Sequence, residues 1–260
     1  MKTLQGKNAL ITGASSGIGA ALAREFARRG ANIILLARNR GRLEEVSEQC
    51  QRLGAGETRL IEADATDYTA IDEFARNLNK HIDFLVLNAG ISQRSLAMET
   101  SQEVNRRVME VDFFAPVHLT KALHTAGKWD ATTHIAATSS ISGLFGFPQR
   151  SAYCAAKHAL KGYFEALQLE TGMKVTLLFP GRINTPISLS ALEGDGSVHG
   201  KMDPGQAGGM DADLCARKCV NGIVRGRRQV RVGGKEMISC FVYKWFPGLF
   251  FRFAGKVSAV

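Results

Sequence analysis

Short apolar runs alternate with longer amphipathic segments along the whole chain. Runs of strand length lie at residues 8–12, 32–37, 58–63, 82–88, 132–139 and 174–179. Between these runs, apolar residues recur at the helical period near residues 17–29, 40–53, 67–79, 101–127 and 151–170. A last helical pattern near 211–226 precedes a short strand at 229–232. Parallel strands need crossover connections, and helices supply them. The order therefore predicts an α/β fold, a doubly wound parallel sheet of about seven strands flanked by helices.

Length and composition predict one domain. A chain of 260 residues with 45% hydrophobic residues can bury a full core, and open α/β domains of this size often form one unit. No apolar run reaches the roughly 20 residues of a membrane span, and no signal-peptide pattern precedes the first strand. We therefore expect a single cytoplasmic domain over residues 1–260, with a lid segment near 185–210 and a basic, aromatic C-terminal segment at 235–260.

The five cysteines are odd in number and scattered. Cys215 and Cys219 lie one helical turn apart, but no second Cys or His pair accompanies them. The pattern favours structural thiols over a zinc site, and we expect no metal.

A glycine-rich turn joins the first strand to the first helix. Residues 12–19 read Thr-Gly-Ala-Ser-Ser-Gly-Ile-Gly. Gly13 permits a tight turn, Gly17 lets the backbone approach a pyrophosphate, and Gly19 lets the helix pack closely. The helix N-terminus then faces the phosphates, so the turn predicts a dinucleotide site.

A tyrosine and a lysine share one helix face further along the chain. Lys157 follows Tyr153 by four residues, and Ser140 precedes Tyr153 by thirteen. A fixed positive charge near a phenol favours the phenolate, which lowers a pKa that is otherwise about 10. Tyr153 is therefore a candidate general acid or base.

In this order, the motifs resemble those of the short-chain dehydrogenase/reductase family over nearly the whole chain. The matching residues are Thr12 to Gly19, Asp64, Asn88-Ala89-Gly90, Ser140, Tyr153, Lys157, Pro180-Gly181 and Thr185. The resemblance implies a Rossmann fold and hydride transfer between a nicotinamide and a carbinol or carbonyl. Within the family, residues 184–203 are similar to the dehydrogenase/reductase family member 7 group.

The resemblance also implies residue roles. Tyr153 would exchange a proton with the substrate oxygen, Lys157 would lower its pKa and hold the nicotinamide ribose, and Ser140 would polarise the carbonyl. Adjacent strand residues point to opposite sides, so only one of Ser139 and Ser140 can face the substrate, and the family spacing to Tyr153 selects Ser140. The implied cofactor site comprises Gly13, Ser15, Ser16, Gly17, Ile18, Gly19, Arg38, Asp64, Ala65, Asn88, Ala89, Gly90, Tyr153, Lys157, Pro180, Gly181 and Thr185.

The end of the second strand predicts the choice of cofactor. Residues 36–40 read Leu-Ala-Arg-Asn-Arg and contain no carboxylate for the ribose hydroxyls, whereas a guanidinium suits a 2′-phosphate. We therefore expect NADP(H), with Arg38 as the main contact and Arg40 or Arg42 in support. Arg40 and Arg42 are alternatively solvated helix residues, the interpretation we favour for Arg42. Asp64 is alternatively the cap of the following helix.

One position departs from the family pattern. The family usually carries Asn in a V-N-x-x-G sequence, where it holds a water that relays protons from the lysine. This chain has Asp112 there, which still accepts a hydrogen bond but adds a negative charge that opposes Tyr153 ionisation. Asp112 is either an adequate substitute or the mark of an impaired enzyme. The alternative function is an NADPH-binding scaffold or redox sensor.

Excess positive charge gathers at the C-terminal end. Residues 216–260 hold ten Lys and Arg against Glu236 alone, which leaves 23 basic and 23 acidic residues before them. The same segment carries Phe241, Tyr243, Trp245, Phe246, Phe250, Phe251 and Phe253. A stacking platform for nucleic acid would be more polar between its rings, so we expect no nucleic acid partner. The pattern favours a lid over the active site, with contact to an anionic membrane surface as the alternative.

Apolar residues near the expected site predict an apolar substrate, unless they serve packing alone. They are Leu144, Phe145, Phe147 and the segment 187–192. A lipophilic ketone, aldehyde or alcohol fits them.

The helices near 101–127 and 151–170 carry apolar residues on more than one face, among them Phe113, Phe114 and Tyr163. In this family such helices pair across a two-fold axis, so we expect a homodimer or homotetramer.

Overall fold

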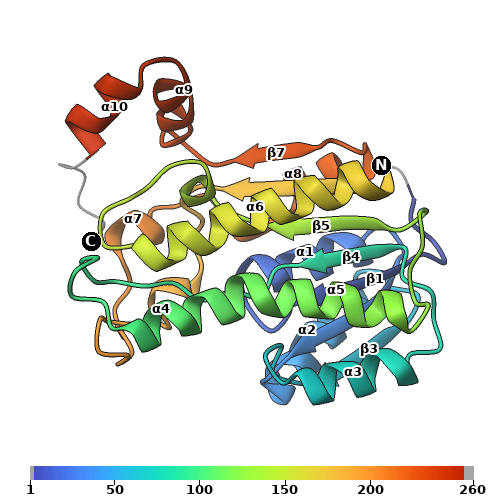
Figure 1. Ribbon diagram of the computed structural model, residues 1–260. Coiled ribbons are helices and arrows are strands. Elements are labelled where there is room, and N and C mark those ends of the chain that lie inside the picture. The colour runs from blue at the N-terminus through green and yellow to red at the C-terminus, as the bar shows by residue number, and fades with distance from the viewer. Residues whose placement is uncertain (1–2, 255–260) are drawn as a thin grey trace.

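Seven parallel strands form one sheet in the order β3-β2-β1-β4-β5-β6-β7 (Figure 1). The computed structural model describes residues 3–254. The strands are β1 (Asn8–Thr12), β2 (Asn32–Ala37), β3 (Thr58–Glu62), β4 (Phe84–Leu87), β5 (His134–Thr138), β6 (Lys174–Pro180) and β7 (Gln229–Val232). The chain builds outward from β1 to β3, returns to place β4 beside β1, and then builds toward β7. The predicted doubly wound Rossmann fold is confirmed, and its direction reverses between β1 and β4, where such sheets bind ligands.

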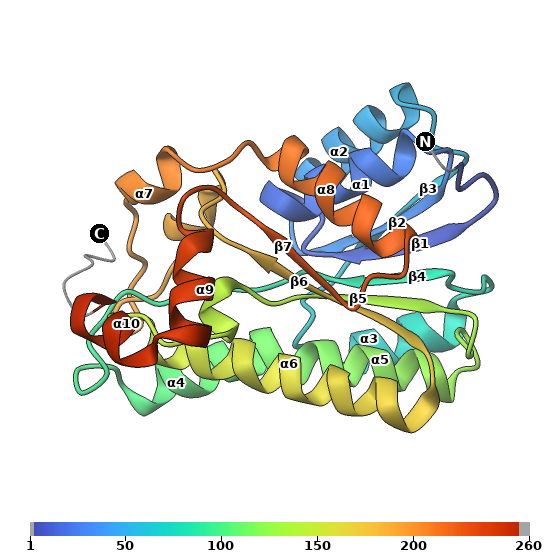
Figure 2. The ribbon, with the colours of Figure 1, turned by 90° about the horizontal axis from the view of Figure 1, so that it is seen from above.

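Helices cover both faces of the sheet (Figure 2). One face carries α1 (Gly17–Ala27), α2 (Arg40–Arg52) and α8 (Ala212–Val224). The opposite face carries α3 (Tyr68–Asn77), α4 (Gln102–Met109), α5 (Ala115–Thr125) and α6 (Ser151–Thr171). Each layer buries its own apolar core against the sheet, around Phe26 on the first face and Phe164 on the second. Burial on two faces explains why the central strands are continuous apolar runs.

Polar side chains cap the N-termini of several helices. Asn39 accepts a hydrogen bond from the backbone of Arg42, and Asp67 and Asp211 cap α3 and α8 in the same manner. Such caps satisfy backbone N–H groups that the first helical turn leaves without partners.

The helix predicted over 101–127 is present over residues 102–125, with one change in its backbone hydrogen bonding. A π-helical turn at Glu110–Phe114 separates α4 from α5, and Pro116 follows within the first turn of α5. A π turn accommodates an extra residue, and proline lacks the N–H that would continue the α-helical ladder. Asp112 lies inside this turn and is buried.

Short elements gather beyond the carboxyl ends of the strands. They are the 3-10 turns Ile141–Gly143 and Pro186–Ser188, α7 (Pro204–Ala207), α9 (Met237–Trp245) and α10 (Pro247–Ala254). Figures 1 and 2 show α9 and α10 as a pair at this end, after β7. Residues 255–260 of the predicted C-terminal segment lie outside the described residues. Within residues 3–254, no helix has the length and apolar character to cross a bilayer.

Candidate active site

The glycine-rich turn lies against the end of β4. The hydroxyl of Thr12 accepts hydrogen bonds from the backbone N–H groups of Asn88 and Ala89, at 2.9 and 3.0 Å. Gly13 has φ +63°, and a Cβ on it would lie 2.8 Å from the Cα of Ala89. A Cβ on Gly19 would overlap the carbonyl oxygen of Gly13. The close packing predicted for Gly19 is therefore present. Because they lack side chains, these glycines let the turn lie close to the end of β4, where the strand order reverses.

The first turn of α1 fits a pyrophosphate. Ser16 precedes the helix without capping it through its side chain, and among the described residues of that first turn none is acidic. Gly17, at φ +53°, lies against Thr185, whose Cβ would be 3.3 Å from a Cβ on the glycine. Backbone N–H groups at a helix N-terminus attract phosphate. Ser15 and Ile18 belong to the same turn, so these predicted cofactor residues come together.

Arg38 lies at the end of β2 beside the carboxylate of Asp64. The Arg38 guanidinium is exposed and lies 3.6 Å from Asp64 Oδ2. Burial raises the pKa of Asp64, but hydrogen bonds from Thr66, with Arg38 and Arg107 nearby, lower it below its usual range. Asp64 and the adjacent Ala65 therefore sit with Arg38 at the expected adenosine end.

The other two arginines of this region face different partners. Arg40 Nε donates to Glu44 Oε1 at 2.9 Å, and the backbone N–H of Arg42 donates to Asn39. Both side chains are exposed on α2. This arrangement favours the interpretation of Arg40 and Arg42 as helix surface residues.

Lys157 is buried at the centre of the candidate catalytic group. Its Nζ donates to the carbonyl oxygen of Thr138 at 3.0 Å, and lies 3.0 Å from Asp112 Oδ2. The same nitrogen lies 5.6 Å from the centre of the Tyr153 ring. The end of β5, the π turn and α6 thus bring the lysine, the aspartate and the tyrosine together.

Asp112 and Lys157 form an ion pair in which both side chains are buried. Burial raises the pKa of Asp112, against the opposing effects of Lys157 and the backbone N–H of Ile91. Burial lowers the pKa of Lys157, but the charge and hydrogen bond of Asp112, together with Tyr153, outweigh burial and raise that pKa. A Cβ on Gly90 would lie 3.0 Å from Asp112 Oδ2 and 3.2 Å from Lys157 Nζ, so a larger residue there would press on the ion pair.

Ser139 and Ser140 point to different sides. Ser139 donates to the backbone carbonyl of Lys157 at 3.0 Å, on the α6 side. Ser140 instead lines a cavity of about 460 Å³ and lies 3.4 Å from the carbonyl of Pro180. The two serines, which follow the end of β5, therefore face opposite sides, as expected.

The cavity beside Ser140 is largely apolar and is walled by the C-terminal helices. Its apolar lining comes from Ile141, Phe147, Ile238, Val242, Leu249, Phe250, Phe253 and Ala254. Gly181, which follows β6, and the charged side chains Arg150, Arg182, Asp203 and Glu236 complete the wall. The segment 235–254 therefore covers the cavity, as a lid would. Glu236 fastens it by accepting from the backbone N–H groups of Arg182 and Gly234, at 2.8 and 2.9 Å.

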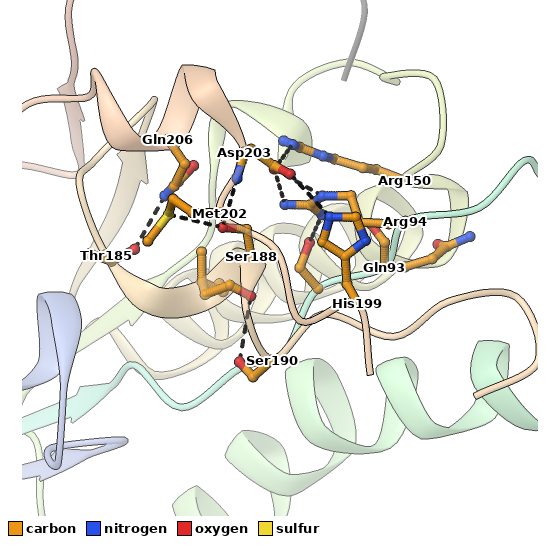
Figure 3. A network of polar contacts seen from close by, with 12 residues as sticks. Gln93, Arg94, Arg150, Thr185, Ser188, Ser190, His199, Met202, Asp203 and Gln206 are labelled. Carbon is orange, nitrogen blue, oxygen red and sulfur yellow. Dashed lines mark hydrogen bonds and ion pairs between the residues drawn. The ribbon is translucent and has the colours of Figure 1, made fainter. Parts of the chain in front are cut away.

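A buried ionic network joins the segment 185–210, the expected lid, to the body of the protein (Figure 3). Asp203 Oδ2 accepts from Arg94 Nε and Nη2 at 2.9 and 2.6 Å, and from Arg150 at 3.2 Å. His199 Nε2 lies 3.6 Å from the other oxygen of Asp203. Arg150 immediately precedes α6, so the network joins residues 199–203 to the helix of Tyr153.

The sequence did not single out Arg94, Arg150 or His199. Arg94 and Asp203 are 109 positions apart, and neither lies in a periodic pattern that would relate them. The thiols of Cys215 and Cys219 are buried, with sulfur atoms 4.0 Å apart. Among residues 3–254, no cluster of three or more His, Cys, Asp or Glu could hold a metal ion.

A family model for short chain dehydrogenases matches residues 7–195, most of the chain. The chain belongs to the short chain dehydrogenase family. It is 39% identical over 256 residues to dehydrogenase/reductase SDR family member 7B of Bos taurus, covering 94% of this chain and 78% of the relative. The resemblance to the member 7 group predicted from residues 184–203 is thus confirmed.

Solved structures of other short chain dehydrogenases share the fold. An alcohol dehydrogenase from the archaeon Thermococcus sibiricus, complexed with 5-hydroxy-NADP, is 25% identical with a TM-score of 0.75, covering 88% of this chain and 97% of that one. A short chain dehydrogenase from Burkholderia phymatum in complex with NAD has a TM-score of 0.80 at 21% identity, with 96% of each chain covered.

Proposed function

We propose that this short chain dehydrogenase interconverts an alcohol and a carbonyl on an apolar substrate, using NADP(H), with Tyr153 as the general acid and base. The observation that carries the proposal is the placement of Ser140. Ser140 lines an apolar cavity and lies two residues after the end of β5. The last carbonyl of β5, that of Thr138, accepts a hydrogen bond from Lys157, whose Nζ lies beside the Tyr153 ring.

Each side chain of the group has a task that its position supports. The bound nicotinamide supplies or accepts a hydride. Tyr153 gives a proton to the substrate oxygen during reduction and takes it back during oxidation. Ser140 donates a hydrogen bond where negative charge develops on that oxygen. Lys157 keeps a positive charge near the phenol and is held in place by Thr138 and Asp112.

A preference for NADP(H) is supported by Arg38. Its guanidinium is exposed at the end of β2 and is only loosely paired with Asp64, at 3.6 Å. A guanidinium binds phosphate through two parallel hydrogen bonds, whereas an acidic residue at this position would suit the ribose hydroxyls of NAD. The solved relatives bind either cofactor: the Thermococcus sibiricus structure is complexed with 5-hydroxy-NADP and the Burkholderia phymatum structure with NAD, so the preference rests on Arg38.

The cavity supports an apolar substrate. Its volume of about 460 Å³ falls within the range of small-molecule sites. Aliphatic and aromatic side chains of α9 and α10 line it, together with Ser140 and Ser142. A lipophilic ketone, aldehyde or alcohol suits this lining.

The experiment is a panel of lipophilic ketones and aldehydes, with NADPH oxidation followed by absorbance. We expect turnover with members of the panel. Binding of NADPH without oxidation by any member would instead support a scaffold or redox sensor. One observation favours that alternative: Asp112 holds the Lys157 ammonium at 3.0 Å and weakens its positive field at the phenol.

A further inference from the structure

The helix pair α9–α10 turns a row of large apolar side chains toward solvent. We call these residues the aromatic face; they are Ile238, Phe241, Trp245, Phe246, Leu249, Phe251 and Phe253. Trp245 is 59% exposed and Phe251 66%. Soluble surfaces seldom gather so many large apolar side chains on two adjoining helices, so the face is an interaction site.

The aromatic face is held outward by a packed inner side. Phe250 and Cys240 are buried against the body of the protein. The Phe250 ring lies 4.8 Å from the ring of Phe145 and 5.2 Å from that of Tyr243. Because the inner side is anchored in the core, the exposed residues are fixed in orientation by the same helices.

Positive charge accompanies the aromatic face. Lys235, Lys244 and Arg252 are exposed on or beside the two helices, and Lys244 Nζ lies 4.9 Å from the Trp245 ring. Glu236 is the one acidic residue of segment 235–254, and its carboxylate is bound to the backbone of Arg182 and Gly234. The face is therefore apolar and cationic together.

We propose that the aromatic face docks this protein onto an anionic lipid bilayer. Helices with aromatic and basic residues lie in the interface, with their rings at the acyl boundary and their cations at the headgroups. A second copy suits the face less well. A two-fold contact would set each patch against itself and bring Lys244 and Arg252 near like charges.

The docking surface is continuous with the wall of the cavity. Ile238, Leu249 and Phe253 line the cavity and are also exposed. On a bilayer, the rim of the cavity would lie at the lipid surface, where an apolar substrate dissolves. This entry route rests on the proposed reductase function. Docking to the bilayer does not depend on that function, because vesicle binding is measured without turnover.

Vesicle binding by the full chain tests the proposal. The probes are vesicles of phosphatidylcholine alone and of phosphatidylcholine with about 30% phosphatidylserine. Of the two tryptophans, Trp129 is buried and donates to Thr120, so Trp245 is the one that lipid can reach. We expect co-sedimentation with the anionic vesicles and a blue shift of Trp245 emission.

Two pairs of variants separate the apolar and the ionic contributions. Phe241→Ser with Phe251→Ser should weaken binding at least about tenfold, because two aromatic side chains no longer enter the interface. Lys244→Glu with Arg252→Glu should weaken binding to anionic vesicles about tenfold or more. The matched controls, Leu169→Ser on α6 and Lys121→Glu on α5, change exposed residues outside the face and should leave binding unchanged.

Three results would overturn the proposal. The first is no binding to anionic vesicles, and the second is equal binding to neutral and anionic vesicles that the charge reversals do not alter. The third is a change of oligomeric mass in the Phe241 and Phe251 variant while vesicle binding persists, which would assign the face to contact between copies.

Discussion

Lys157 meets two oxygen atoms inside the protein, the carbonyl of Thr138 and the carboxylate of Asp112. The carbonyl fixes the position of the ammonium, and the carboxylate fixes its charge by raising the pKa of Lys157. The same carboxylate places a negative charge beside Lys157, which partly offsets the positive charge that the ammonium presents to the Tyr153 ring.

Replacing Asp112 with Asn tests this balance. The acidic limb of alcohol oxidation should move to lower pH, because the base form of Tyr153 would persist over a wider range. Removing one partner of a buried ion pair should also lower the free energy of unfolding by about 3–5 kcal/mol. Rate against pH and urea unfolding measure the two effects. An unchanged pH profile in a folded variant would reduce Asp112 to a structural role.

The proposed preference for NADP(H) over NAD(H) depends on Arg38. Arg38→Asp should shift the ratio of NADPH to NADH affinity toward NADH by roughly 10- to 100-fold, because one charged hydrogen-bonded contact contributes about 1.5–3 kcal/mol. Arg42→Asp, a charge change of the same size on α2, is the control and should alter the ratio little. Equal affinities of the unmodified protein for the two cofactors would contradict the assignment.

The sequence predicted individual site residues where a local rule constrained them. Ser140 could be told from Ser139 because adjacent strand residues face opposite sides and the family spacing to Tyr153 selects Ser140. The turn glycines could be assigned because they follow a strand and open a helix. The direct contact of Asp112 with Lys157 could not be predicted, since it depends on how a π turn rotates that side chain inward. The Arg94–Asp203–Arg150 network was equally beyond reach, because only the folded chain brings these residues together.

At the scale of elements, β5 carries a buried histidine between sheet neighbours. His134 Nε2 lies 2.8 Å from the hydroxyl of Thr176 on β6. That hydroxyl donates to the carbonyl of Arg227, so His134 Nε2 donates to Thr176. Burial, with a smaller effect of Lys174, lowers the pKa of His134 to about 4.

This histidine predicts an acid-sensitive fold. Because the pKa in the folded state lies below the usual value of about 6.5, the unfolded chain binds the proton more readily, and stability falls as pH drops from about 6.5 toward 4. His134 should contribute a loss of about 2 kcal/mol between pH 7 and pH 5. Urea unfolding at both pH values measures it, and His134→Gln should show a smaller loss. The same loss in the variant would assign the effect to other groups.

The elements themselves were largely predictable, because strands buried on two faces appear as apolar runs and helices as a three-to-four-residue period. The π turn inside the helix predicted over 101–127 was not predictable. The apolar spacing continues through it, so periodicity alone does not reveal the change in hydrogen bonding at Glu110–Phe114. Residues 185–210 and the start of segment 235–254 are positioned instead by long-range contacts of Asp203 and Glu236, which periodicity does not predict.

For the whole molecule, the expected homodimer or homotetramer stays a prediction. Several residues that suggested it, Val104, Val108 and Phe164, are buried within the chain, whereas Phe114 remains 48% exposed beside Phe113. We expect at least a dimer by light scattering at micromolar concentration, and a lower mass for Phe114→Glu. Met98→Glu, at an exposed loop residue, is the control. A monomeric mass for the unmodified protein would contradict the expectation.

The central claim is that Tyr153 performs acid–base chemistry on a substrate held beside Ser140. Its most direct test compares the unmodified protein with Tyr153→Phe, using NADPH and the best carbonyl of the panel. Loss of the hydroxyl should lower kcat/KM by about 10²- to 10⁴-fold or more, while NADPH affinity stays nearly unchanged, because the glycine-rich turn and Arg38 hold the cofactor. Turnover by Tyr153→Phe at a rate comparable to that of the unmodified protein would contradict the account.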